Sequence, residues 1–223
     1  MRWLFRSVTG LALLASLVSA CGSTSSDRLI FRFIRWDNTG ITQPDSVGEG
    51  SADIDVVQDV CTAGTMGGPP TFEPFSNTII NAVFRNEQAS DIRFDGYTTE
   101  ISDKRLAQAN VTNGELTATI PGGRCSTVDR ACGSDDDCVV SGTAGTCTHS
   151  ETTVSGIVLV DLLAKVGVIQ PVAELHPDIL GRSLTITVTF FGSDANQSFE
   201  TAATYTVVFA DFDNCSTSTG GGA

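Results

Sequence analysis

Apolar and polar residues alternate with a period of two through much of the chain, and this pattern predicts β-strands. The clearest segment is Ser183–Phe191, where threonines alternate with large apolar side chains. Ala203–Ala210 repeats the pattern, and the turn-forming residues 192–198 between them predict a hairpin. Thr78–Asn86 and Asp91–Ile101 predict a second pair of strands, because both are rich in β-branched and aromatic residues.

Four shorter segments predict further strands, and the helical signal is small. The strands are expected at Leu29–Trp36, Asp53–Cys61, Gly114–Pro121 and Thr153–Val160, and residues 62–74 are expected to form a loop. After the last of them, Asp161–Val166 predicts one or two turns of helix. Seven or eight strands with little helix indicate an all-β fold, an antiparallel β-sandwich.

The predicted architecture resembles the immunoglobulin-like β-sandwiches found in many modules of bacterial envelopes. The resemblance is one of class, because the cysteine–tryptophan–cysteine order of antibody domains is absent: Trp36 precedes Cys61. The sandwich domain is expected to cover residues 28–215, with a disulfide-rich loop insertion at 122–150. Residues 216–223 are expected to form a disordered tail.

The amino-terminal residues predict an export signal. Arg2 and Arg6 precede an apolar run, Val8–Val18, which is shorter than the about 20 residues that a membrane-spanning helix needs. The run ends in Val18-Ser19-Ala20-Cys21, an aliphatic residue followed by two small residues and a cysteine. This motif resembles the lipobox of bacterial lipoproteins.

The resemblance implies cleavage between Ala20 and Cys21 and attachment of acyl chains to Cys21. Residues 1–20 would then be the signal peptide and residues 21–27 a lipidated, flexible tether, anchored stably to the lipid bilayer by two or three chains. Gly22 stands where many such proteins carry an inner-membrane retention aspartate, so the outer membrane is favoured. The alternative is an ordinary signal peptide, with Cys21 left free or joined in a disulfide.

The charge of the chain argues against some partners. Removing residues 1–20 takes two of the 13 basic residues and none of the 26 acidic ones, so the net charge becomes about −15. Nucleic acids and anionic lipid head groups both require basic patches. The sequence therefore predicts no nucleic-acid partner, and contact with the bilayer only through the acyl anchor.

Cysteine number and position predict three disulfides. If Cys21 carries lipid, six of the seven cysteines remain, an even number in an exported protein. Cys61 and Cys215 each adjoin the end of a predicted strand, and we expect them to pair. The pairing within the other four is left open, and the alternative is a zinc site with these four as ligands or with His149 in place of one. These four are Cys125, Cys132, Cys138 and Cys147.

Three acidic segments are candidate calcium ligands. Asp135–Asp137 lacks the alternating spacing of an EF-hand loop. Asp194–Asn196 and Asp211–Asn214 faintly resemble the strand-end calcium motifs of cadherin-type sandwiches, but the same residues are common in turns. We expect no metal or other cofactor, with a calcium-stabilised adhesion module as the alternative.

The sequence offers little for catalysis. A histidine-dependent mechanism would have to use His149 or His176, since the chain has only two histidines. No glycine-rich phosphate loop is present, and nothing selects a pair of carboxylates. A non-enzymatic envelope lipoprotein that contacts a protein or glycan is therefore favoured, with residues 122–150 as the expected recognition loop. The alternative is a hydrolase with an unidentified carboxylate site.

Overall fold

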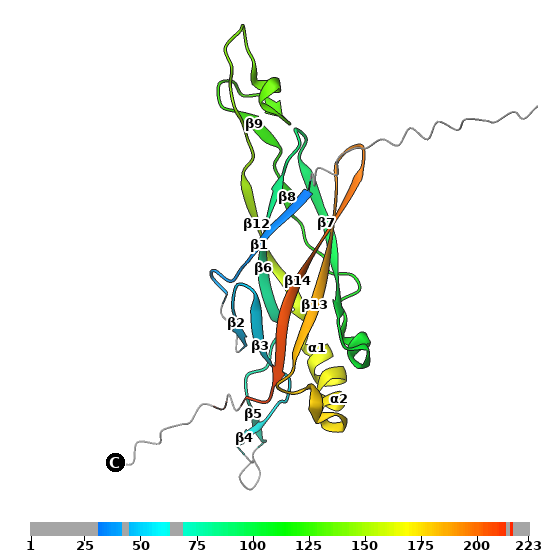
Figure 1. The fold of residues 1–223 in the computed structure, drawn as a ribbon. Coiled ribbons are helices and arrows are strands. Elements are labelled where there is room, and N and C mark those ends of the chain that lie inside the picture. The colour runs from blue at the N-terminus through cyan, green and yellow to red at the C-terminus, as the bar shows by residue number, and fades with distance from the viewer. Residues whose placement is uncertain (1–30, 42–44, 63–68, 213–214, 216–223) are drawn as a thin grey trace, which may run out of the picture.

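Two β-sheets pack face to face in the computed structural model, which describes residues 31–41, 45–62, 69–212 and 215 (Figure 1). The smaller sheet has the strand order β1-β6-β12, and the larger has the order β2-β3-β14-β13-β7-β8. The smaller sheet consists of β1 (Phe31–Asp37), β6 (Thr78–Asn86) and β12 (Glu151–Val160). The larger consists of β2 (Ser46–Val47), β3 (Ser51–Asp55), β14 (Ser198–Ala210), β13 (Ser183–Ser193), β7 (Ile92–Ile101) and β8 (Thr119–Ile120).

Short elements extend from both ends of this pair of sheets. A two-stranded hairpin and a small three-stranded sheet, ordered β10-β9-β11, accompany several 3-10 turns. The hairpin is β4 (Val60–Thr62) with β5 (Thr71–Phe72), and the small sheet is β9 (Gly123–Cys125), β10 (Ala131–Cys132) and β11 (Cys147–Thr148). The 3-10 turns are Lys104–Ala109, Asp135–Cys138 and Pro177–Ile179.

One continuous helical segment connects β12 to the turn before β13. It comprises α1 (Leu162–Ala164), a π-helical turn (Lys165–Ile169) and α2 (Gln170–Leu175). Asp161 caps its start, because the Asp161 carboxylate accepts a hydrogen bond from the Ala164 amide at 2.7 Å. The helical segment runs through Gly167 and Pro171, well beyond the one or two turns that the sequence predicted.

Aromatic side chains from both sheets form the centre of the core. Phe190 of β13 is fully buried, and its ring centroid lies 4.8 Å from that of Phe84 in β6 and 5.8 Å from that of Phe94 in β7. Trp36 of β1 packs edge-on against Tyr205 of β14 and donates its indole hydrogen to the Thr204 carbonyl at 2.9 Å. These contacts join the two sheets and satisfy the indole donor in the interior.

The strands with the most regular alternation lie where the sequence predicted them. β6 has the predicted bounds, β7 starts one residue later than predicted, and β13 and β14 pair along eleven positions in an antiparallel hairpin. A mostly β fold with mostly antiparallel strands is thus confirmed.

Two strand predictions were wrong. Asp53–Cys61 is not one strand: β3 ends at Asp55, and β4 begins only at Val60 and pairs with β5 instead. β3 runs parallel to β14, so the larger sheet is not purely antiparallel. Of the predicted strand Gly114–Pro121, only β8 and a single bridge from Gly114 to Tyr97 are formed, because this segment pairs intermittently with β7.

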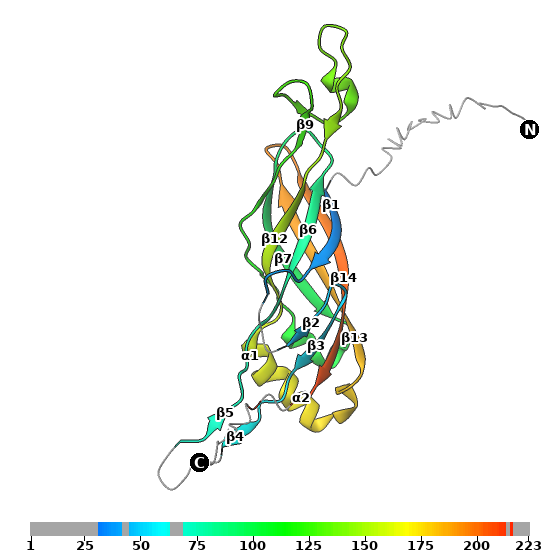
Figure 2. The same ribbon diagram turned by 90° about the vertical axis from the view of Figure 1, so that its left-hand side faces the viewer.

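The molecule is elongated, and its two ends differ in structure (Figures 1 and 2). Residues 122–150, which we call the cysteine module, lie at one end. β1 begins at this end too, since Phe31 pairs with Asn86, whose carbonyl oxygen contacts His149 of the module. The helical segment and the β4–β5 hairpin lie at the other end, which we call the helix end. Within the described residues, no helix is long and apolar enough to span a membrane.

Candidate functional site

Six cysteines form three disulfides in the structure. Cys61 is joined to Cys215 across a sequence separation of 154 residues, which is the pair that their positions predicted. The module contains the other two bonds, Cys125–Cys138 and Cys132–Cys147, a pairing that the sequence left open. Cys21 and Ala20, the residues of the predicted lipidation and cleavage, lie outside the described residues.

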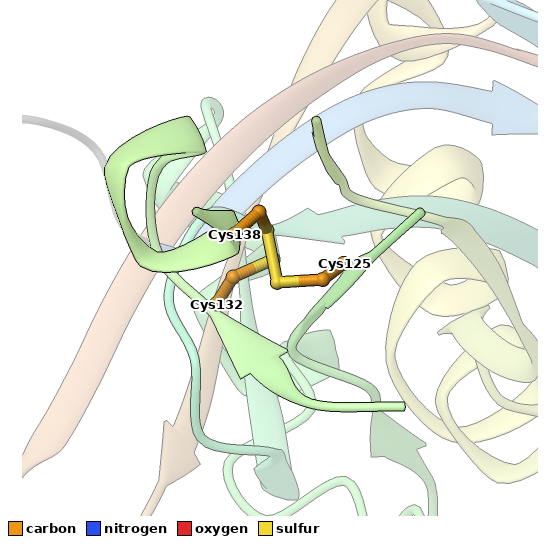
Figure 3. Close-up of side chains that lie close together, drawn as sticks. All are labelled: Cys125, Cys132 and Cys138. Atoms are coloured by element: carbon orange, nitrogen blue, oxygen red, sulfur yellow. A yellow bond between two sulfur atoms is a disulfide. The ribbon is translucent and has the colours of Figure 1, made fainter. Parts of the chain in front are cut away.

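The cysteine module is organised around its disulfides. Cys125, Cys132 and Cys138 are buried, with sulfur atoms within 4.8 Å of one another (Figure 3). Each of these sulfurs is bonded to another sulfur, whereas a zinc site requires thiolates. The arrangement therefore favours a disulfide-stabilised loop over the zinc alternative.

His149 fastens the module to the sandwich. Its Nδ1 lies 2.7 Å from the carbonyl oxygen of Asn86, the last residue of β6. A carbonyl oxygen can only accept, so Nδ1 carries the hydrogen and Nε2 faces Cys147 Sγ at 3.5 Å. His176, by contrast, is exposed at the end of α2. The two histidines lie at opposite ends of the molecule and do not form a joint site.

The acidic segments considered for calcium serve local hydrogen bonds. Asp137 accepts from the amides of Gly133 and Ser134, and Asp135 accepts from the Cys147 amide at 2.7 Å. In the β13–β14 turn, Asp194 Oδ1 accepts from the amides of Asn196 and Gln197, at 2.8 and 2.9 Å. These contacts are typical of turn formation. Within Asp211–Asn214, residues 213 and 214 lie outside the described residues.

The helix end carries most of the exposed apolar side chains. Among the described residues, nine large hydrophobic side chains are exposed, and only Val139 and Val140 belong to the cysteine module. The other seven lie on the helical segment, on the β4–β5 hairpin or just after β14, near Cys215. We call Leu162, Leu163, Val166 and Leu175 the helix-end surface; the remaining three are Val60, Phe72 and Phe212.

A shallow pocket adjoins the helix-end surface. Its volume is about 490 Å³, and Leu162 and Leu163 line it together with Asn77, Gln108 and Asp161. Leu163 is 82% exposed, which is high for a leucine on a helix that otherwise buries Ala164, Ile169 and Ala173. Single exposed leucines are ordinary, but two neighbouring ones that line a pocket are typical of a contact surface.

Two acidic residues lie next to the exposed leucines in the sequence. Asp161 and Glu174 flank the leucines, and no described lysine or arginine lies within ion-pair distance of either. Asp178 pairs with Arg105 at 3.0 Å, and that pair holds the 3-10 turn Lys104–Ala109 against the end of the helical segment. The Arg105 guanidinium lowers the pKa of the Asp178 carboxyl.

A buried ion pair lies directly beneath this surface. Lys165 and Asp45 have side chains that are each 1% exposed, and Lys165 Nζ lies 2.7 Å from Asp45 Oδ2. Thr78 donates its hydroxyl hydrogen to the same oxygen at 2.5 Å, and the Asp55 amide donates to Asp45 Oδ1 at 2.9 Å. Burial is the main cause of a lowered pKa for Lys165.

Sequence reasoning missed both the helix-end surface and the buried pair. The sequence predicts Leu162 and Leu163 only as part of a helix, because their exposure depends on packing that a single sequence does not show. Lys165 did leave a signal, since it is the one charged residue within the apolar stretch 162–169. Comparisons with protein families, with curated proteins and with solved structures find no match for this chain.

Proposed function

We propose that this protein is an exported lipoprotein that acts without catalysis, as a tethered module whose helix-end surface binds a protein partner. The observation that carries the proposal is the unequal distribution of exposed apolar side chains, seven of nine at the helix end among the described residues. Exposed apolar clusters beside a pocket are characteristic of interaction sites.

The proposed anchor would leave the helix end free. Cys21 precedes Phe31 by ten residues, which span at most about 35 Å when fully extended. Phe31 lies at the cysteine-module end, so a lipid on Cys21 keeps that end close to the bilayer, and we favour the outer membrane. The helix end then points away from the membrane, and it replaces residues 122–150 as our proposed recognition surface.

The chemistry of the surface favours a protein over the glycan that the sequence left open. Its apolar side chains are aliphatic leucines and a valine, which suit apolar side chains of a partner. The flanking Asp161 and Glu174 favour a partner with basic residues around that apolar contact. The same acidic groups oppose docking onto anionic lipid head groups.

We further propose that the two sheets form an immunoglobulin-like sandwich. In such domains strands A, B and E share one sheet, and C, F and G share the other. The orders β1-β6-β12 and β14-β13-β7 support this assignment, with β13 between β14 and β7. The chain between β8 and β12, where strand D would lie, contains the cysteine module.

The anchor is tested by Cys21→Ala in the full-length protein. We expect the variant to lose incorporation of labelled fatty acid and to move from the membrane fraction to the soluble one. Its three disulfides should form as before, which mapping of cysteine-linked peptides would show. Retention of the label, or scrambled disulfides, would contradict the assignment of Cys21 as the lipidated residue.

The surface is tested by photo-crosslinking in cells, with a benzophenone side chain at position 163. The matched control is position 140, because Val140 is also exposed but belongs to the cysteine module. We expect one dominant protein adduct from position 163, at least about tenfold weaker after Leu175→Glu, and none from position 140. Adducts of equal yield from both positions, or none from position 163, would contradict the proposed surface.

A further inference from the structure

We infer that Lys165 and Asp45 form a cross-linking site, in which the Lys165 amine condenses with the Asp45 carboxyl group to an amide. The pair is placed for this reaction, because Nζ lies 2.7 Å from Oδ2 and both side chains are almost fully buried. Two reacting groups held at such a distance react as if at very high concentration. This inference is independent of the proposed function.

Both carboxylate oxygens of Asp45 accept hydrogen bonds. The Asp55 amide donates to Oδ1 at 2.9 Å, and the Thr78 hydroxyl donates to Oδ2 at 2.5 Å. Donors on both oxygens draw electron density from the carboxyl carbon and stabilise the charge that develops when an amine attacks it. The oxygen that leaves would be Oδ2, which is also nearest to the amine.

The surroundings of Lys165 favour its neutral, nucleophilic form. The side chain is almost fully buried, and this burial favours the neutral amine, whereas the Phe75 ring, whose centre lies 5.1 Å from Nζ, attracts the ammonium form. Desolvation lowers the pKa of this amine, although Asp45 and Asp55 both oppose the shift. Burial also keeps out water, which otherwise favours hydrolysis of an amide over its formation.

The ion pair contains all the atoms and protons that the condensation requires. One proton moves from the ammonium to the carboxylate, and the neutral Nζ then attacks Cγ of Asp45. The Nζ–Cγ bond forms, the Cγ–Oδ2 bond breaks, and Oδ2 leaves as water with two of the three ammonium hydrogens. Nothing is oxidised or reduced. We assign the transfer of these protons to Asp55, a buried residue whose amide binds Asp45 Oδ1 and whose carboxyl group interacts electrostatically with Lys165.

The bond would brace the helix end. It joins the segment before β2 to the π-helical turn, across a sequence separation of 120 residues. The Cys61–Cys215 disulfide lies at the same end. A cross-link here would fix the helical segment, and the leucines it exposes, against the sandwich.

Peptide mapping of the full-length protein tests the inference. After reduction and unfolding, trypsin should release a branched peptide in which residues 36–85 are joined to residues 131–182, uncut after Lys165. Its mass should be lower by one water than the sum of its two chains. Linear peptides alone, with cleavage after Lys165, would overturn the inference and leave an ordinary buried ion pair.

Four variants sharpen the result. Lys165→Met should abolish the branched peptide, whereas Lys104→Met, at the chain's other lysine and an exposed one, should leave it unchanged. Asp45→Asn should give the same branched peptide, since the amide then releases ammonia instead of water. Asp55→Asn should slow its formation by at least about 100-fold. If a variant fails to fold, the wild-type digest still decides.

Discussion

The two ends of this molecule are stabilised in different ways. The cysteine module buries little besides Cys125, Cys132 and Cys138, and its two disulfides take the place of a hydrophobic core. At the helix end, Ile169 and Ala173 belong to the main hydrophobic core. The disulfide at this end, Cys61–Cys215, joins residues that are far apart in the sequence. Short segments poor in apolar residues commonly depend on disulfides in this way.

This difference in stabilisation, by disulfides at one end and by a hydrophobic core at the other, explains where apolar side chains are exposed. A module without a core of its own has few large side chains to expose, and only Val139 and Val140 are exposed among its described hydrophobic residues. The helix end has enough buried contacts to keep its shape while Leu163 and Leu175 remain exposed. A rigid scaffold that presents an apolar surface is the usual arrangement of a binding site.

The largest expected effect comes from removing the long-range disulfide. Cys61→Ser with Cys215→Ser should lower the free energy of unfolding by about 4 kcal/mol, because the bond closes a loop of more than 100 residues in the unfolded chain. Urea unfolding at constant pH would measure it. This loss should appear in the transition of the whole sandwich, since both cysteines flank its strands.

The matched change in the module sharpens the comparison. Cys132→Ser with Cys147→Ser should leave the sandwich transition within about 1 kcal/mol of the wild type. Trypsin should then cut the folded protein after Arg124 or Arg130, inside the loosened module. A sandwich transition lowered as much as by the first pair would break the distinction between the two ends.

Substitution of a single core residue at the helix end should lower the free energy of unfolding by a smaller amount. Ile169 is fully buried within the main core, so Ile169→Ala should cost about 3 kcal/mol through lost burial and a new cavity. Val140→Ala in the module should change the free energy of unfolding by less than about 0.5 kcal/mol. Equal effects at the two positions would show that the helical segment does not share the core.

Local pattern was sufficient for the regular strands. β6, β7 and β13 were predicted to within two residues, because each alternates apolar and polar side chains and is rich in β-branched residues, whereas β14 begins five residues before its predicted start. The pairing of Cys61 with Cys215 followed from their positions beside predicted strands. Period and position are properties that a single sequence contains.

What was missed depends on contacts between distant segments. The parallel pairing of β3 with β14 and the break after Asp55 follow from the tertiary course of the chain. The helix runs past the predicted end at Val166 and through Pro171, although proline and glycine usually end helices. Burial of Lys165 needs Asp45 as its partner, and no local pattern links residues 120 positions apart.

The smallest predicted effect concerns an ion pair at the helix end and depends on pH. The Arg105 guanidinium, 2.6 Å from Asp103, holds the pKa of the Asp103 carboxyl at about 2, below its ordinary value of 3.8. A lowered pKa in the folded state stabilises above the unfolded pKa and loses that contribution as pH falls through the folded one. The stabilisation should therefore be complete above about pH 5 and lost between about pH 4 and 2.

Asp103→Asn tests this directly, since asparagine keeps the capping contact to the Arg105 amide but carries no charge. At pH 7 the variant should be less stable by at most about 1 kcal/mol, because the partly exposed Arg105 leaves the pair screened by solvent. Urea midpoints measured from pH 7 down to pH 2 should converge for the two proteins. A difference that persists at pH 2 would mean that Asp103 acts through packing, and that its charge does not contribute to the free energy of unfolding.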